Sequence, residues 1–346
     1  MKRPLTLAVA FAALALVHVE ARSHHSASSY DQRTEVSIEG TIVRYEWTNP
    51  HVYLWIEEQT DNGERVTWEI EGQPPSILRR LGWTADSVSE GERVTVKANP
   101  ARSPDRKVAL MTSLERVDDT VLGAGFQSIL ATLAEENVAG TQRATSLAGT
   151  WTTQFKLEAL LPFVNPSSTL QLTEQGRAAL ESFVEETENP GIECIPGSAP
   201  VLMVIPDLKS MELRGDVLLL RGEIDAIERT VHLNVDSHDG AVESLQGHSI
   251  GRWEGDTLVI DTTHFTPHRS GNAGGVPSGP GKRLVERLAL NDEGAHLTYN
   301  FVLEDPEYLA APVTGEVRWS YRPDLEYAAL ACDLDNARRF TARPGN

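Results

Sequence analysis

Apolar and polar residues alternate in five short runs near the start of the chain, and this period of two predicts five β-strands. Turn-forming residues stand between several of the runs, and a short helical pattern that ends at Gly82 lies between the third and the fourth. Five strands in about ninety residues are typical of a small barrel of the oligonucleotide/oligosaccharide-binding (OB) type. The predicted strands cover residues 35–46, 52–59, 65–71, 93–99 and 107–117, and the predicted helix covers 76–81.

A second stretch of alternating residues is organised around the sequence GHSIGRWEGDTLVIDTTHF at 247–265. Its two runs, 248–253 and 257–263, are rich in β-branched and aromatic residues and are separated by Glu254-Gly255-Asp256, so they predict a tight β-hairpin. The segment 266–282 that follows is loaded with Gly, Pro and Ser and predicts a long mobile loop that could act as a lid.

The rest of the second half also reads mainly as strands joined by short turns, which predicts an antiparallel closed barrel or a sandwich. Simple up-and-down succession favours the barrel, and Gly149 with Trp151 at its first strand is similar to the start of lipocalin-like barrels. One helix with Thr173 as its N-cap precedes most of the strands. The further predicted strands are 201–205, 209–213, 217–222, 228–235, 284–290, 296–302, 313–321 and 327–332.

Between the two sets of strands, apolar residues from Phe126 to Leu133 recur at helical spacing, which predicts a helix inside a linker. The predicted fold class is mostly all-β, a small OB-like five-stranded barrel followed by a larger antiparallel lipocalin-like barrel with one or two helices. The predicted divisions are a signal peptide at 1–23, the small barrel at 24–117, a helical linker at 118–146, the larger barrel at 147–340 and a tail at 341–346.

The first residues of the chain predict export. Lys2 and Arg3 precede an apolar run that is too short to span a bilayer, and small residues follow near Ser23, where a signal peptidase would cleave. We therefore expect a periplasmic or secreted protein with no integral membrane segment. The formal net charge is −19, and it becomes −21 without residues 1–23, which hold three cations and one carboxylate. So acidic a chain makes nucleic acid and anionic membranes poor partners.

Two cysteines, Cys194 and Cys332, are the only ones in the chain. In an exported protein a pair of cysteines most simply forms a disulfide, and two buried free thiols are the alternative.

Three histidines of the first domain are candidate metal ligands. If cleavage follows Ser23, the α-amino group and imidazole of His24 can chelate one ion, and His51 can add a third nitrogen. This arrangement would be similar to the histidine brace of copper-dependent oxygenases, so copper is the candidate cofactor. His25 is an alternative ligand, and an ordinary frayed terminus is the structural alternative.

The hairpin at 247–265 carries the candidate catalytic and ligand-binding residues of the second domain. Asp261 and His264 could form an acid/base pair at a barrel mouth with His248 nearby. The candidate ligand-binding residues are Ser249, Arg252 and Thr263. The alternative is that these residues only build the hairpin. The chain contains no phosphate-loop, His-Glu-x-x-His or Cys-x-x-Cys motif.

Two resemblances cover most of the chain. Several short motifs, among them Asn49-Pro50-His51, make residues 24–117 similar to a bacterial family of exported domains of unassigned function. Cys194, Pro196, Gly247 to Val259 and Cys332 make residues 147–340 resemble a second uncharacterised set of exported bacterial proteins. These resemblances imply export and β domains, and they imply no activity. The other motifs are His24-His25-Ser26, Trp68-Glu69-Ile70-Glu71, Leu81-Gly82-Trp83-Thr84 and Asn99-Pro100-Ala101.

The preferred function hypothesis is a periplasmic protein that holds a small, largely apolar ligand in the larger barrel, while the first domain recruits a protein partner or a metal. The alternative is an enzyme, either an oxidative copper enzyme that uses His24, or a lyase or isomerase that uses Asp261 and His264.

Overall fold

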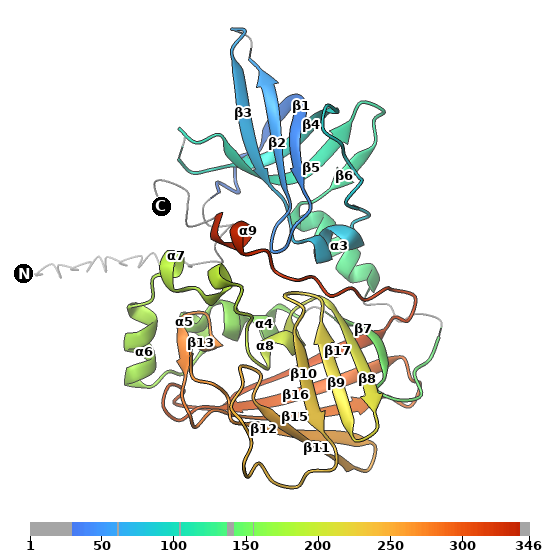
Figure 1. Cartoon of the computed structure of the whole chain (residues 1–346), viewed down its shortest axis with the longest axis vertical. Coiled ribbons are helices and arrows are strands. Elements are labelled where there is room, and N and C mark those ends of the chain that lie inside the picture. Colours follow the sequence, from blue (N-terminus) through green and yellow to red (C-terminus); the bar gives the residue numbers. More distant parts are fainter. Residues whose placement is uncertain (1–29, 61, 104, 137–141, 155, 340–346) are drawn as a thin grey trace, which may run out of the picture.

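The computed structural model describes residues 30–339 apart from 61, 104, 137–141 and 155. These residues form two closed β-barrels of different size, and helices lie mainly where the two barrels face each other (Figure 1). The mostly all-β prediction, with a small barrel followed by a larger one, is confirmed. The predicted signal peptide and the tail at 341–346 lie outside the described residues.

The smaller barrel is formed by five strands, and its closure depends on a parallel pairing between β3 and β5. Its order of neighbours is otherwise β3-β2-β1-β4-β5, and a short sixth strand, β6, extends the sheet beyond β5. The period-two pattern placed all five barrel strands within a residue or so of their observed bounds, because alternate residues face the core. The strands are β1 Val36–Glu46, β2 Tyr53–Gln59, β3 Arg65–Glu71, β4 Arg93–Pro100, β5 Val108–Arg116 and β6 Val121–Gly123.

Aliphatic side chains and one tryptophan fill the smaller barrel. The predicted helix is present as α2, Pro75–Arg80, and Trp83 behind it donates its indole N–H to the carbonyl of Gly123 at 2.8 Å. This bond ties the α2 turn to β6. The predicted linker helix is also present as α3, Phe126–Glu136.

The larger barrel closes through nine strands in the order β10-β11-β12-β15-β16-β17-β7-β8-β9. All neighbours are antiparallel except β10 and β11, which pair in parallel, so the prediction of a fully antiparallel barrel is wrong at this pair. Residues 233–247 between them are long enough for the crossover that parallel strands need. The strands are β7 Gly149–Gln154, β8 Leu208–Arg214, β9 Val217–Gly222, β10 Glu228–His232, β11 His248–Glu254, β12 Thr257–Thr263, β15 Arg283–Leu290, β16 His296–Glu304 and β17 Val313–Tyr321.

The predicted hairpin is present as β11 and β12. Glu254 pairs with Thr257, which leaves the two-residue turn Gly255-Asp256, and Gly255 has a φ of 62°. Glycine adopts this left-handed conformation without the strain that a side chain would add.

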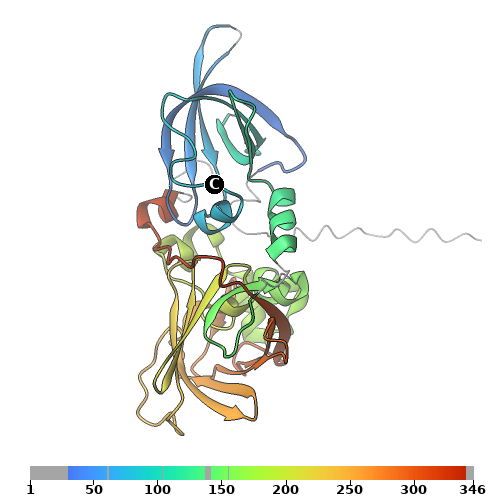
Figure 2. The same cartoon turned by 90° about the vertical axis from the view of Figure 1, so that its right-hand side faces the viewer.

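Short helices and the hairpin β13–β14 cover one end of the larger barrel, and several of these helices lie between the two barrels (Figures 1 and 2). We call this end of the larger barrel the covered end. The predicted N-cap is confirmed, since the Thr173 hydroxyl accepts the N–H of Gly176 at the start of α6. The covering elements are α4 Leu157–Val164, α5 Pro166–Thr169, α6 Glu174–Glu181, α7 Glu185–Glu188, η1 Pro190–Glu193, α8 Val201–Val204, β13 His268–Ala273 and β14 Val276–Ser278.

Three predictions for this domain are wrong. Residues 201–205 form helix α8, because this short apolar run is buried against the barrel end, and such a run does not distinguish a strand from a buried helical turn. Residues 266–282 are not a loop throughout, because they contain the paired strands β13 and β14 and bury most of the residues from Gly271 to Gly279. Residues 327–332 make only the isolated bridge from Leu330 to Ile224, and the chain then continues into helix α9, Leu334–Arg339.

No helix in the described part of the chain is both long enough and apolar enough to cross a membrane.

Candidate functional site

The turn Asn49-Pro50-His51, which the sequence singles out, lies at the junction of the two barrels. The side-chain amide of Asn49 donates to the carboxylate of Asp225 and to the carbonyl of Leu330, both at 3.2 Å. The carbonyl of Asn49 accepts the backbone N–H of Asp333 at 2.8 Å. A turn of the first domain therefore holds the chain that leads from the larger barrel into α9.

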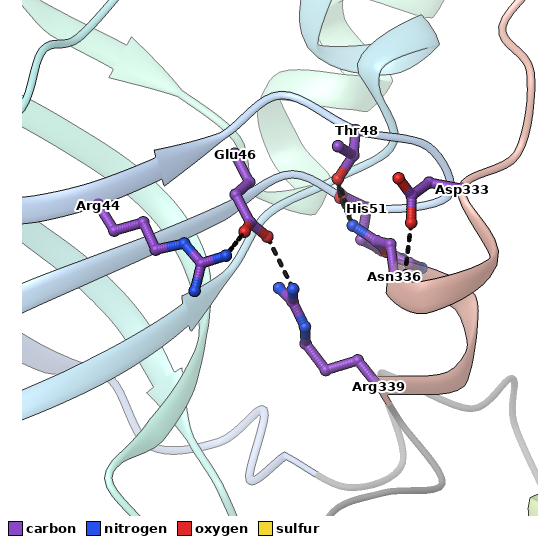
Figure 3. Close-up of polar contacts among 7 residues, drawn as sticks. All are labelled: Arg44, Glu46, Thr48, His51, Asp333, Asn336 and Arg339. Carbon is purple, nitrogen blue, oxygen red and sulfur yellow. Dashed lines mark hydrogen bonds and ion pairs between the residues drawn. The ribbon is translucent and has the colours of Figure 1, made fainter.

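Helix α9 lies against this turn and against strands of the smaller barrel (Figure 3). The amide of Asn336 donates to the carbonyl of His51 at 2.8 Å and also contacts the hydroxyl of Thr48. Arg339 pairs with Glu46 at 2.7 Å (Figure 3). Its guanidinium also lies 4.5 Å and 5.0 Å from the ring centroids of Tyr53 and Trp55. The last helix of the second domain thus binds the first domain, and we call it the C-terminal latch.

A disulfide fixes the base of the latch. Cys194 and Cys332 are bonded, as the pair of cysteines in an exported chain predicted. Arg338 of the latch also pairs with Glu193, next to Cys194, at 3.1 Å. The segment before α8, the latch and the turn of the smaller barrel are therefore joined covalently and by polar contacts.

His51 lies at the base of this junction, with its Nδ1 donating to the carbonyl of Gly72 at 3.0 Å and lying 3.4 Å from a carboxylate oxygen of Glu71. Its predicted partners, His24 and His25, lie outside the described residues. Among the residues that are described, no three His, Cys, Asp or Glu side chains are grouped so as to hold a metal ion. The copper site at the N-terminus stays a prediction.

A charged network occupies the interior of the larger barrel. Arg229 and Glu286 face each other across the core with a contact of 2.8 Å between Nη1 and Oε1, and both are essentially unexposed. Ser249 accepts from the Arg229 Nε at 2.9 Å, Thr262 accepts from its Nη2 at 2.6 Å, and Tyr299 donates to Glu286 at 2.8 Å. Burial, followed by the Glu286 carboxylate, raises the pKa of Tyr299 well above its usual value. All five side chains are satisfied by one another.

Nearer the covered end, Lys282 is buried with its amine 2.7 Å from the hydroxyl of Ser198 and 2.5 Å from the carbonyl of Gly271. The ring of Phe265 lies 4.4 Å away. Burial, with a smaller contribution from the charge of Arg229, lowers the pKa of Lys282 to about 7 against the opposing charge of Asp305. An amine of this kind is part neutral and part charged near pH 7.

The candidate residues of the predicted hairpin divide between the two faces of the barrel wall. Ser249 points inward and joins the Arg229 network, whereas Asp261 lies on the outer face in a two-fold ion pair with Arg283 at 2.8–2.9 Å. Hydrogen bonds from Arg283 lower the pKa of Asp261, which makes this carboxylate a weaker base. Arg252 is exposed on the same outer face and bonds Glu254.

His248 and His264 belong to a cluster of four imidazoles on the outer face, together with His232 and His238. Nδ1 of His238 lies 2.8 Å from Nδ1 of His248, and the rings of His232 and His248 stack at 5.0 Å. His264 bonds Thr263 and stacks on His238 at 5.9 Å. Burial lowers the pKa of His238 and of His248, and the neighbouring imidazoles add to the effect. The cluster joins the crossover 233–247 to the hairpin.

Sequence reasoning missed Arg229, Glu286, Lys282 and Ser198. A signal existed for the first two, because each occupies an inward position of an alternating strand, as in Leu284-Val285-Glu286-Arg287-Leu288. Lys282 and Ser198 gave no local signal, since they lie outside the strands and meet only in three dimensions.

Comparison with known families places the first part of the chain beside uncharacterised proteins. Residues 12–109 match the model of a family of unknown function, DUF6152, which covers most of the smaller barrel and none of the larger one. The match agrees with the resemblance of this part to an uncharacterised family. No curated protein matches the chain.

Proposed function

We propose that this protein is exported and binds a small, largely apolar ligand at the covered end of the larger barrel. The observation that carries this proposal is the buried amine of Lys282, which lies beside the Phe265 ring in a barrel whose core combines many apolar side chains with the Arg229–Glu286 network. A binding site for a small molecule combines apolar walls with a few fixed polar groups, and a barrel of eight or nine strands can hold one such molecule.

The buried charged groups of this barrel differ in whether their direct hydrogen-bond partners include an opposite charge. Arg229 and Glu286 are fully engaged with each other and with three hydroxyl groups. Lys282 is bonded to neutral oxygens, at Ser198 and Gly271, although a buried cation is stabilised most by a carboxylate. A carboxylate or carbonyl oxygen of a ligand would give this amine a better partner than it has now.

The hairpin β13–β14 supplies the cover. It is held by a buried carboxylate, since Asp305 accepts the amide of Asn272 at 2.7 Å and the backbone N–H of Gly279 at 2.8 Å. Arg269 of the hairpin donates to the carbonyl of Ala179 at the end of α6. In this proposal the hairpin moves as a unit to admit the ligand, in place of the mobile lid that its composition predicted.

Native mass spectrometry of the protein isolated from the periplasm tests the proposal. We expect a retained organic molecule and a processed N-terminus, and we expect Lys282→Met to lose the molecule. Lys209→Met is the matched control, because Lys209 is also buried in this barrel but is paired with Asp207. Sodium decanoate, an apolar chain with one carboxylate, should raise the thermal midpoint of the wild type and of the control but not of Lys282→Met. Absence of both a retained molecule and stabilisation by decanoate would refute the proposal.

A further inference from the structure

The contact between Ser198 and Lys282 suggests chemistry as well as binding. We propose that these two residues form a nucleophile–base pair that hydrolyses esters of small apolar carboxylic acids. This inference rests on the proposed function, because the same covered end would hold the acyl group.

Two parts of the chain that are distant in the sequence create the pair. Ser198 precedes α8, whereas Gly271 belongs to β13 and Lys282 follows it by 11 residues, just before β15. The distance of 2.7 Å between the Ser198 hydroxyl and the Lys282 amine is within direct proton-transfer range. Both residues are nearly unexposed, at 4% for Ser198 and 1% for Lys282, so substrate and water reach the contact only when the hairpin β13–β14 moves as in the proposed function.

The surroundings of Lys282 favour a neutral amine, which is the form that can accept a proton. Its Nζ donates hydrogen bonds to two neutral oxygens, the hydroxyl of Ser198 and the carbonyl of Gly271. Burial is the largest cause of its low pKa, of about 7. When the amine is neutral, its lone pair can accept the Ser198 proton, and serine–lysine pairs of this type act as nucleophile and base in known hydrolases.

The backbone on either side of Ser198 is held by one side chain. Gln246 accepts the N–H of Ala199 at 3.1 Å and donates to the carbonyl of Gly197 at 2.9 Å. The Ser198 hydroxyl in turn donates to the carbonyl of Gly271 at 2.8 Å. Gln246 is therefore a positioning residue, which fixes the serine without touching the reacting atoms.

The reaction proceeds in two steps, acylation of Ser198 and hydrolysis of the acyl-serine. In the first, Ser198 Oγ forms a bond to the ester carbonyl carbon and passes its proton to Lys282 Nζ. The C–O bond to the alcohol then breaks, and the alcohol leaves with the proton from Lys282. In the second, Lys282 takes a proton from water, whose oxygen attacks the acyl-serine. The acid is released and Ser198 regains its proton from Lys282.

Reaction with p-nitrophenyl butyrate tests the inference on the full-length protein. We expect release of p-nitrophenolate, and a mass increase of one butyryl group on the peptide that contains Ser198. Ser198→Ala should abolish both, and Lys282→Met should slow acylation by roughly 10²-fold or more, as loss of a general base does. Ser278→Ala is the matched control, because Ser278 is a buried serine of the covering hairpin β13–β14 whose hydroxyl accepts the backbone N–H of His268.

Two further measurements distinguish whether Lys282 acts as a general base or only as a positive charge. The acylation rate of the wild type should rise with pH through about 7, where Lys282 loses its proton. Lys282→Arg keeps the positive charge and should stay inactive, whereas restored activity in this variant would overturn the role as base. If decanoate still stabilises the wild type and Ser198→Ala but no acyl-serine forms, the esterase inference fails alone. Loss of decanoate binding in both would overturn the binding proposal with it.

Discussion

The two barrels of this protein are filled in different ways. The interior of the smaller barrel is aliphatic, with Trp83 as its largest core residue, and Glu71 is buried at its base near the junction. The larger barrel buries Arg229, Glu286 and Lys282 between layers of apolar side chains. Buried charges are retained against a desolvation cost of several kcal/mol each, and perturbed groups gather at functional sites. In the proposed function, ligand specificity therefore lies in the larger barrel, whereas the smaller barrel receives the C-terminal latch.

The largest effect should come from breaking the pair inside the larger barrel. Glu286→Gln leaves Arg229 buried without its carboxylate, and we expect a loss of about 3–5 kcal/mol in the free energy of unfolding. Urea denaturation of this domain measures the loss. The double variant Arg229→Met/Glu286→Leu should recover most of it, because both desolvated charges are removed together.

The smaller barrel offers the matched comparison. Its ion pair between Glu39 and Arg93, at 2.7 Å, is exposed on both sides. Removing Arg93 there should cost less than about 1 kcal/mol, because water screens the pair. Equal losses in the free energy of unfolding would contradict the expectation that the buried pair of the larger barrel contributes more to stability than the exposed pair of the smaller one.

A smaller effect is expected at the latch, where the two barrels meet. Asn336→Ala removes the amide that bonds the carbonyl of His51 and the Thr48 hydroxyl, and the loss should be about 1–2 kcal/mol. Calorimetry should then resolve separate unfolding transitions for the two barrels. Asp335→Ala on the exposed side of the same helix is the control and should leave the wild-type transition in place.

The smallest effect should be the pH response of the four-histidine cluster. The pKa values of His238 and His248 lie below their ordinary value in the folded protein, so the unfolded chain binds more protons as the pH falls through the histidine range. Stability from these groups is therefore present at neutral pH and lost on acidification. Because both rings are partly exposed and water screens their charges, we expect the loss to stay below about 1 kcal/mol.

Urea denaturation at pH 7.5 and at pH 5.5 measures this response. The double variant His238→Asn/His248→Asn should lose less stability between the two pH values than the wild type, because it lacks the two groups that take up protons on unfolding. The same loss in both proteins would show that the cluster is not pH-sensitive.

Much of the fold could be predicted because the local alternation of apolar and polar residues indicates which side chains are buried. The strands of the smaller barrel largely alternate inward apolar and outward polar residues, and the turn at Gly255 of the hairpin β11–β12 carries its own conformational signal. The disulfide could be predicted because the chain has only two cysteines and its start predicts export. Helix α8 could not be predicted, because four apolar residues satisfy a buried strand and a buried helical turn equally well.

For the candidate sites, in contrast, most of the decisive contacts could not be predicted from the sequence. The sequence by itself determined that Asn49-Pro50-His51 forms a turn, that the hairpin carries His248 and His264, and that two barrels follow each other along the chain. Only the tertiary structure decided that the turn receives the C-terminal latch and that Asp261 lies outside the barrel, bound to Arg283. It also decided that Ser198 meets Lys282 across 84 residues of sequence. Periodicity describes which face of one strand is buried, whereas these contacts depend on closure of the barrel and on which segments cover its end, and neither leaves a local pattern.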